Sequence, residues 1–278
     1  MRSNVWSRMT AFFFEHPRFS QKVKIASAYA VIVFVTNCCG AGALCAAERD
    51  FPFYPGEKLT FEIKWQFIPA GEVILEVLPI ETIKGIKIQH FVLITKTNSF
   101  IDLIYKVRQR IDAYTDIDVN RSILYKEVYT MHKSRRDAII DFDWKNFKAQ
   151  YTNFGKKEKP VSIIHGAFDP FSILYYARHL DFKENDELER PVTDGKKCVI
   201  GRATVVKREK VMLDIGEFDT FLMEPELKEV GGVFKKSKGA KIKLWVTADE
   251  RKIPVKIKSK VIVGSFVGEL ISIDYVSE

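Results

Sequence analysis

The segment 58–67 reads KLTFEIKWQF, and it decides the fold class of the chain. Its apolar side chains alternate with polar ones, which is the pattern of a half-buried β-strand with one face toward a core. The next residues, 68–71 (IPAG), are typical of a turn, and the alternation then resumes. Residues 57–78 are therefore predicted to form an antiparallel hairpin, with Trp65 and Phe67 on its inward face.

The same alternation recurs along the rest of the chain, in short segments bounded by Gly, Asp or Asn. Turn signals spaced by about ten residues indicate antiparallel strands rather than βαβ units. The predicted fold class is mainly β, either an antiparallel β-barrel or a curved, sandwich-like sheet. Its further strands are expected at 86–95, 106–114, 121–131, 136–143, 147–153, 197–207, 209–215, 218–224, 241–247, 252–263 and 265–276.

One short central helix is predicted at about 168–180. Asp169 followed by Pro170 is a typical helix start, with the carboxylate as N-cap and the proline in the first turn. Apolar residues then recur at helical spacing up to Leu180. Residues 183–189 are rich in charge and predict a solvated loop, while a weaker helical pattern lies at 99–105.

The N-terminus has the features of an export leader. Two lysines precede the uncharged run 25–37 (IASAYAVIVFVTN), and small residues follow it up to Ala47. This order is typical of a secretory signal peptide, so residues 1–47 are predicted to be removed and 48–278 to form a single β-rich domain in the periplasm. The alternative is an uncleaved inner-membrane anchor, for which the apolar run is short.

Charge and cysteine content narrow the function classes. The chain has 44 Lys+Arg and 36 Asp+Glu, and the leader takes five basic residues and one acidic residue, which leaves a net charge of +4. Nucleic-acid binding is therefore not indicated. Only Cys198 lies outside the leader, so no internal disulfide is expected there, and no His or Cys spacing predicts a metal or cofactor site.

Several landmarks in a fixed order carry a resemblance to a known family. The matching segments are 52–59 (PFYPGEKL), Trp65, 70–71 (AG), 169–172 (DPFS), 193–196 (TDGK) and 244–249 (LWVTAD). Over about residues 51–275 the chain resembles the bacterial family named domain of unknown function 3108. The resemblance implies an exported, β-rich envelope protein of a Gram-negative bacterium. It implies no catalytic residue, because the family has no established activity.

Common catalytic signatures are missing from the sequence. It contains no G-x-S-x-G elbow, H-E-x-x-H pair, P-loop or G-x-G-x-x-G turn. The most enzyme-like candidates are His165 and His132, each of which has carboxylates nearby in the sequence. A periplasmic hydrolase built on one of them is the alternative to a non-catalytic protein, which the sequence favours because Asp169 already has a structural role as helix cap.

Aromatic and basic residues supply the candidate binding site. A barrel of this size can hold a small apolar ligand, or the same aromatics can form a packed core, and alternation does not separate the two. The basic tip 131–137 can receive an anionic headgroup. The expected ligand is a hydrophobic or amphipathic envelope component such as a lipid, or a protein partner; the oligomeric state is left open. The candidate residues are Trp65, Tyr105, Tyr125, Tyr175, Trp245, Arg135 and Arg136.

Overall fold

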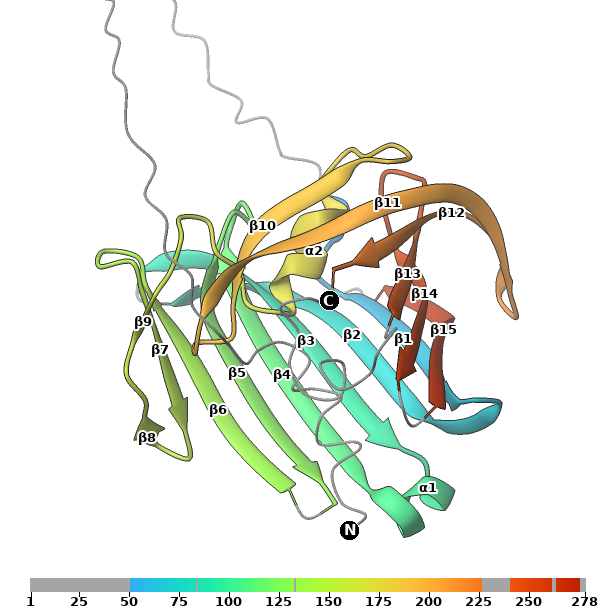
Figure 1. Ribbon diagram of the computed structural model, residues 1–278, viewed down its shortest axis with the longest axis horizontal. Coiled ribbons are helices and arrows are strands. Elements are labelled where there is room, and N and C mark those ends of the chain that lie inside the picture. The colour runs from blue at the N-terminus through green and yellow to red at the C-terminus, as the bar shows by residue number, and fades with distance from the viewer. Residues whose placement is uncertain (1–50, 84, 133, 227–240, 262–263, 276–278) are drawn as a thin grey trace, which may run out of the picture. The chain divides into compact units, whose positions relative to one another are not determined.

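The computed structural model describes residues 51–83, 85–132, 134–226, 241–261 and 264–275. These residues form fifteen strands of one antiparallel sheet and two short helices, which confirms the mainly β prediction (Figure 1). The strands are β1 (Glu57–Trp65), β2 (Ile68–Ile83), β3 (Ile86–Thr97), β4 (Val107–Asp116), β5 (Ser122–Met131), β6 (Ser134–Asp143), β7 (Lys148–Asn153), β8 (Lys156–Lys157), β9 (Val161–Ser162), β10 (Glu187–Thr193), β11 (Cys198–Leu213), β12 (Gly216–Pro225), β13 (Lys241–Thr247), β14 (Pro254–Val261) and β15 (Gly264–Tyr275). The helices are α1 (Ser99–Tyr105), where the weaker helical pattern lies, and α2 (Ser172–Arg178).

The sheet is a meander whose last strand returns to its first. Strand order is β10-β11-β12-β13-β14-β15-β1-β2-β3-β4-β5-β6-β7-β8, and the short β9 pairs with β7. The link between the C-terminal and N-terminal halves is the β15–β1 pair, which runs from Glu57 opposite Tyr275 to Trp65 opposite Phe266. In the described residues the outermost strands, β10 and β8, are not hydrogen-bonded to each other, so the sheet is curved but not closed.

Side chains connect the two free ends of the sheet. The turn between β10 and β11 packs against β6 and β7, where Lys196 pairs with Glu158 at 3.2 Å and lies over the ring of Tyr151. Gly195 makes this approach possible: its φ is +80°, and a Cβ there would lie 2.9 Å from the Cβ of Tyr151. The backbone of Phe168 also bonds to the edge of β10, donating to Pro191 at 2.9 Å and accepting from Thr193 at 2.8 Å.

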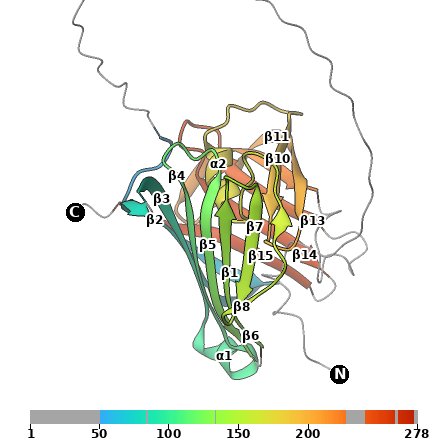
Figure 2. The same cartoon turned by 90° about the vertical axis from the view of Figure 1, so that its left-hand side faces the viewer.

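Helix α2 lies inside the curve of the sheet, toward the end opposite to α1 (Figures 1 and 2). Tyr175 stacks on Phe91 of β3 with ring centroids 3.8 Å apart, and Phe53 meets both rings edge-on. All three side chains belong to the main hydrophobic core. The helix is shorter than the predicted 168–180, since it begins at Ser172 and ends at Arg178.

Asp169 caps this helix from two residues before the N-cap, the position that the sequence predicted for it. Phe171, not Asp169, occupies the N-cap position and makes no side-chain cap. The buried Asp169 carboxylate nevertheless accepts hydrogen bonds from the backbone N–H groups of Phe171 and Ser172, both at 2.8 Å. It also accepts one from the Ser122 hydroxyl at 2.6 Å, which ties the helix start to β5.

The first hairpin corrects the predicted turn. The turn lies at Gln66 and Phe67, with Gln66 at φ 58°, and β2 already begins at Ile68. Phe67 is therefore 94% exposed rather than inward, and Trp65 is only half-buried. Gly71 is not a turn residue but a point of close strand approach, since a Cβ there would lie 2.2 Å from the Lys96 carbonyl oxygen.

Two other predictions about strands are wrong. Segments 197–207 and 209–215 form the single strand β11, which passes through a bulge between Val205 and Lys207. The predicted loop 183–189 contains the start of β10. The predicted leader, 1–47, lies outside the described residues.

Candidate functional site

The curved sheet and α2 enclose a cavity of about 1250 Å³. This volume exceeds the range of about 300–1,000 Å³ that is usual for small-molecule pockets, so it can hold an extended, lipid-sized molecule. Most of its lining is apolar. The apolar lining includes Phe61, Ile63, Val73, Leu75, Leu93, Ile111, Tyr125, Ile140, Tyr151, Phe171, Leu174, Tyr176, Leu180, Val192, Leu244, Val246 and Phe266.

The strand pattern explains this lining. Each strand places alternate residues on its inner face, so β1 contributes Phe61 and Ile63, and β2 contributes Val73 and Leu75. Small residues also line the cavity. These are Ala138, Gly201, Ala203 and Gly268. The period-2 alternation therefore accounts for the apolar character of the wall.

A polar ladder crosses three neighbouring strands of the cavity wall. Gln109 of β4 donates to Glu127 of β5 at 2.8 Å, and Arg136 of β6 donates to the other Glu127 oxygen at 3.0 Å. Burial raises the pKa of Glu127, and the attraction of Arg136 opposes that rise. For Arg136, burial acts to lower the pKa, but the Glu127 charge more than offsets it and the pKa lies above its usual range. The ladder is satisfied without a ligand.

Arg190 differs from the other lining arginines. Its guanidinium lies 4.3 Å over the ring of Tyr176, and its Nε is buried without a hydrogen-bond partner. Among the described residues no carboxylate forms an ion pair with it, whereas Arg202 pairs with Glu189 at 2.5 Å. Since no described acceptor or counter-ion holds its guanidinium, Arg190 is the group in this wall best able to receive an anion.

The charged residues of the lining are predominantly cationic. Seven are basic and three, Glu127, Glu189 and Asp194, are acidic. Burial raises the pKa of Asp194 to about 6, although the N–H groups of Lys196 and Lys197 donate to its carboxylate and lower it. The lining therefore carries a positive excess, which favours an acidic ligand over a basic one.

One of the seven cations holds the fold together. Arg178, 1% exposed, donates to both oxygens of Glu57, which is 2% exposed, at 2.5 and 2.9 Å. It also donates to the carbonyl oxygens of Pro52 and Arg251. Because every polar contact is satisfied within the protein, this pair anchors α2 to β1 and is not a ligand site.

The residues predicted from the sequence divide between the cavity and its surroundings. Tyr125 and Arg136 line the cavity, whereas the other five do not. Tyr175, on α2, packs against Phe91 in the core, and Trp245, on the face of β13 away from the cavity, donates to Glu209 at 2.9 Å. Arg135 is exposed. Of the remaining two residues, Trp65 is half-buried. Tyr105 packs beside the cluster of Val107, Tyr129 and Met131.

The two histidines of the hydrolase alternative have no catalytic arrangement in the described residues. His165 is exposed, and its contacts are with the rings of Trp144 and Phe147. His132 stacks on Tyr105 at the β5–β6 turn. No described side-chain hydrogen bond joins either ring to a carboxylate.

His90 is a histidine that does meet carboxylates. It lies between Glu81, 2.7 Å away, and Asp112, 3.0 Å away, and stacks on Tyr114. The three residues come from the neighbouring strands β2, β3 and β4, and Phe91, the next residue along, points into the core. His90 therefore belongs to a cross-strand polar cluster on the outer face of the sheet. Nowhere in the described segments do His, Cys, Asp or Glu residues gather in a metal-binding group.

Sequence reasoning missed Arg190 and the small residues of the wall. Arg190 stands in a charged run, ELERP (187–191), that gives no alternation strong enough to predict a strand. In the described segments, neither helix is long and apolar enough to cross a membrane.

Comparisons with known proteins agree with this architecture. A family model described as "Protein of unknown function (DUF3108)" matches residues 60–271. No curated protein matches the chain. Among solved structures, a β-barrel-like protein of domain of unknown function DUF1849 from Brucella abortus is similar in fold, with a TM-score of 0.53 and 11% identity over 80% of this chain and 98% of that chain.

Two further solved structures are more distant. One is provisionally assigned as a lipoprotein from Parabacteroides distasonis, with a TM-score of 0.31 and 10% identity over 80% of this chain and 97% of that chain. The other, provisionally assigned as an exported protein with a YmcC-like fold, comes from Bacteroides fragilis, with a TM-score of 0.29 and 9% identity over 80% and 97%. Scores this low carry no argument about function.

Proposed function

The chain belongs to the DUF3108 family of proteins of unknown function, and we propose that it is an exported, periplasmic protein that binds one acidic amphiphile in its cavity. The observation that carries this proposal is the 1250 Å³ cavity, whose apolar wall includes an arginine without an acceptor. The acyl part of a ligand lies against the strands, and its acidic headgroup meets Arg190.

The wall supports an apolar ligand body because burial of apolar surface is the main driving force for such binding. Phe61, Leu75, Leu93 and Ile111 present a continuous hydrocarbon surface from four adjacent strands, β1 to β4. Such a surface matches alkyl chains better than a compact polar molecule. The preformed cavity also spares the protein the cost of ordering its own side chains on binding.

Arg190 supports an acidic headgroup. Its planar guanidinium is fixed over Tyr176, so it is oriented before a ligand arrives. A carboxylate or phosphate can accept from its terminal nitrogens, which form no described hydrogen bond. Neither group is more strongly favoured by this geometry, and the analysis of bound material distinguishes them.

Export is proposed from the leader-like residues 1–47, whose basic, apolar and small-residue regions follow one another in the order of a signal peptide. The cysteine distribution is compatible with this location, since Cys198 is free and half-buried and needs no partner. N-terminal sequencing of the purified protein is expected to begin near Glu48. Recovery of intact Met1 in membranes would contradict cleavage.

The test is analysis of ligand carried by the protein that cells export. Solvent extraction followed by mass spectrometry is expected to release an equimolar acidic amphiphile. Arg190→Met should weaken its retention by about tenfold or more, since a hydrogen bond to a charged group is lost. Arg202→Met is the matched control, because Arg202 also lines the cavity but is already paired with Glu189.

A second pair of variants tests the cavity itself. Ala177→Trp places an indole from α2 into the space, whereas Val128→Trp places one on the exposed outer face of β5. The first should prevent uptake of a fluorescent fatty acid while the second does not. Equal uptake by both variants, or co-purification of a protein and no amphiphile, would refute the proposal.

A further inference from the structure

A cluster of large apolar side chains lies exposed at one end of the sheet. We call it the tip patch, and it consists of Phe67, 94% exposed, Leu103, 85%, Ile104, 66%, Phe100, 60%, and Ile68, 46%. Single exposed apolar residues are common on protein surfaces, but a contiguous group of five marks an interaction site. The tip patch does not line the cavity described above.

Two connected elements bring these residues together. Phe67 lies in the β1–β2 turn, Ile68 is the first residue of β2, and the other three lie on α1. Asn98, just before α1, donates its side-chain N–H to the Pro69 carbonyl at 2.7 Å and its backbone N–H to the Ala70 carbonyl at 3.0 Å. These bonds hold the helix start against the first residues of β2.

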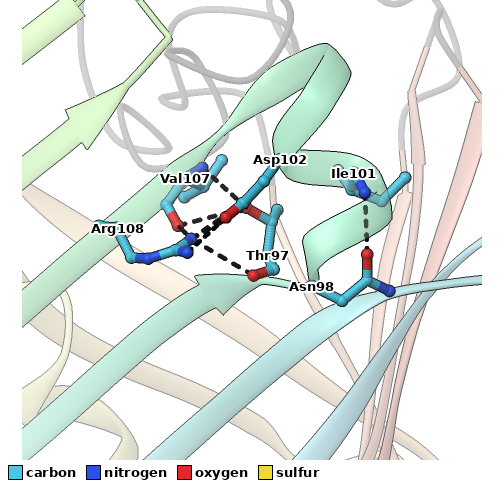
Figure 3. Close-up of polar contacts among 6 residues, drawn as sticks. All are labelled: Thr97, Asn98, Ile101, Asp102, Val107 and Arg108. Carbon is cyan, nitrogen blue, oxygen red and sulfur yellow. Dashed lines mark hydrogen bonds and ion pairs between the residues drawn. The ribbon is translucent and has the colours of Figure 1, made fainter.

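A polar network fixes α1 in place (Figure 3). Asn98 caps the helix by accepting from the N–H of Ile101 at 2.9 Å. Asp102 accepts from Thr97 at 2.5 Å and from both terminal nitrogens of Arg108, at 3.0 and 2.5 Å. A two-turn helix has little stability of its own, so these bonds hold it in a conformation that keeps three apolar side chains in water.

Unpaired cations surround the tip patch. Lys106 follows α1 directly, Arg135 lies at the neighbouring β5–β6 turn, and Lys258 and Lys260 lie at the end of β14. Lys260 is opposite Ser265, whose carbonyl accepts from the N–H of Gln66 in the β1–β2 turn at 2.7 Å. All four are exposed, and no described ion pair joins them to a carboxylate.

Two acids beside the tip patch, by contrast, are neutralised. Asp102 pairs with Arg108, and Glu72 pairs with Lys96 at 2.9 Å. The result is an apolar tip within a positively charged border. Aromatic and aliphatic side chains flanked by Lys and Arg suit the boundary between acyl chains and acidic headgroups. A protein partner of ordinary composition does not require this border.

We propose that the tip patch is a membrane-docking surface that inserts Phe67, Phe100, Leu103 and Ile104 into an anionic lipid bilayer. The four unpaired cations contact the headgroups around the insertion. Binding therefore depends on the acidic lipid content and weakens as salt concentration rises, since salt screens exposed charges.

The direct test uses tryptophan as a depth probe in the protein as cells export it. Leu103→Trp places an indole in the tip patch, and Met212→Trp, at another exposed apolar position, is the matched control. Vesicles of phosphatidylethanolamine and phosphatidylglycerol contain a brominated acyl chain as quencher. The tryptophan at 103 should be quenched beyond the wild-type background, and the one at 212 should not.

A polar variant gives the second measurement. Phe67→Ser, Phe100→Gln and Leu103→Gln are combined, and because all three side chains are exposed the fold should survive, which circular dichroism verifies. Sedimentation with the anionic vesicles should weaken by at least about tenfold relative to wild type. Wild-type protein should bind phosphatidylcholine vesicles far less well.

Three outcomes would overturn the proposal. The first is equal quenching at 103 and 212, and the second is undiminished sedimentation of the polar variant. The third is a concentration-dependent dimer of wild type that the polar variant does not form, because a second copy of the chain would then cover the tip patch.

Discussion

The buried pair of Arg178 and Glu57 makes a strong prediction about stability. Both side chains are nearly inaccessible, and the pair joins α2 to β1 across 121 residues of sequence. Removal of one partner leaves the other charge buried without its counter-ion, which typically costs about 3–5 kcal/mol of unfolding free energy. Arg178→Met also leaves the carbonyl oxygens of Pro52 and Arg251 without a donor.

A double-mutant cycle separates the charge from the packing. Arg178→Met and Glu57→Leu should each destabilise by about 3–5 kcal/mol, while the double variant should cost less than the sum by about 2–3 kcal/mol, because neither charge is then left alone. Urea denaturation followed by tryptophan fluorescence measures all four free energies. Arg178→Lys should also destabilise, since an ammonium group cannot reproduce the two-pronged contact.

Additive effects would refute this reasoning. If the double variant cost the full sum, the two side chains would contribute separately and would not form a coupled pair. Losses below about 1 kcal/mol for both single variants would mean that the pair is as exposed as an ordinary surface ion pair. Either result would also remove the argument that α2 is anchored in the cavity wall by a charge.

Three further predictions concern single positions. Burial and the nearby cations lower the pKa of His179 from 6.5 to about 4. The neutral ring therefore contributes stability that is fully present above pH 6.5 and is lost as the pH falls toward 4. His179→Phe should reduce this loss of unfolding free energy by at most about 3 kcal/mol, as measured by denaturation curves at several pH values. Phe61→Ala should cost about 3 kcal/mol, whereas Phe67→Ala should stay within about 0.5 kcal/mol, and equal effects would contradict the strand register. Gly71→Ala should destabilise by about 1–3 kcal/mol, because its Cβ would clash with the Lys96 carbonyl; a silent substitution would contradict the close strand approach.

The fold class could be predicted from the sequence because a period of two is a direct consequence of strand geometry. Segments such as 241–247, with alternating Lys and apolar residues, match β13 at both ends. The position of the β1–β2 turn was harder to predict from the sequence. Its Gln-Phe pair lacks the usual turn residues, while the nearby Pro69 and Gly71 suggest a turn two residues too late.

Buried charged residues and half-exposed strands were also difficult to predict from the sequence. Glu57 and Arg178 are residue types that are almost never buried unless paired, and their pairing is a long-range event that no local pattern reveals. β10 escaped prediction because Glu187 and Glu189 are exposed and only the end of the strand, from Pro191, is buried. Local sequence reports the average environment of a residue type, and these positions depart from it.

The cavity could not be separated from a packed core for a related physical reason. Alternation states which side chains point inward, but not whether opposite walls meet. Whether they meet depends on the sum of side-chain volumes across strands far apart in the sequence, such as Ala138 on β6 and Gly201 on β11. The sequence therefore predicted both Tyr125 and Tyr175 as cavity residues, whereas in the structure Tyr125 lines the cavity and Tyr175 does not.

The two proposed binding surfaces share the strands β1 and β2 and can still be separated experimentally. β1 carries Phe61 and Ile63 into the cavity, and the turn that follows it exposes Phe67. Ala177→Trp fills the cavity without touching the tip patch, so it should abolish ligand retention and leave vesicle binding intact. The polar tip variant should do the reverse. If either variant changed both properties, the cavity and the tip patch would be energetically coupled through β1 and β2, because both strands contribute side chains to the cavity and flank the exposed turn.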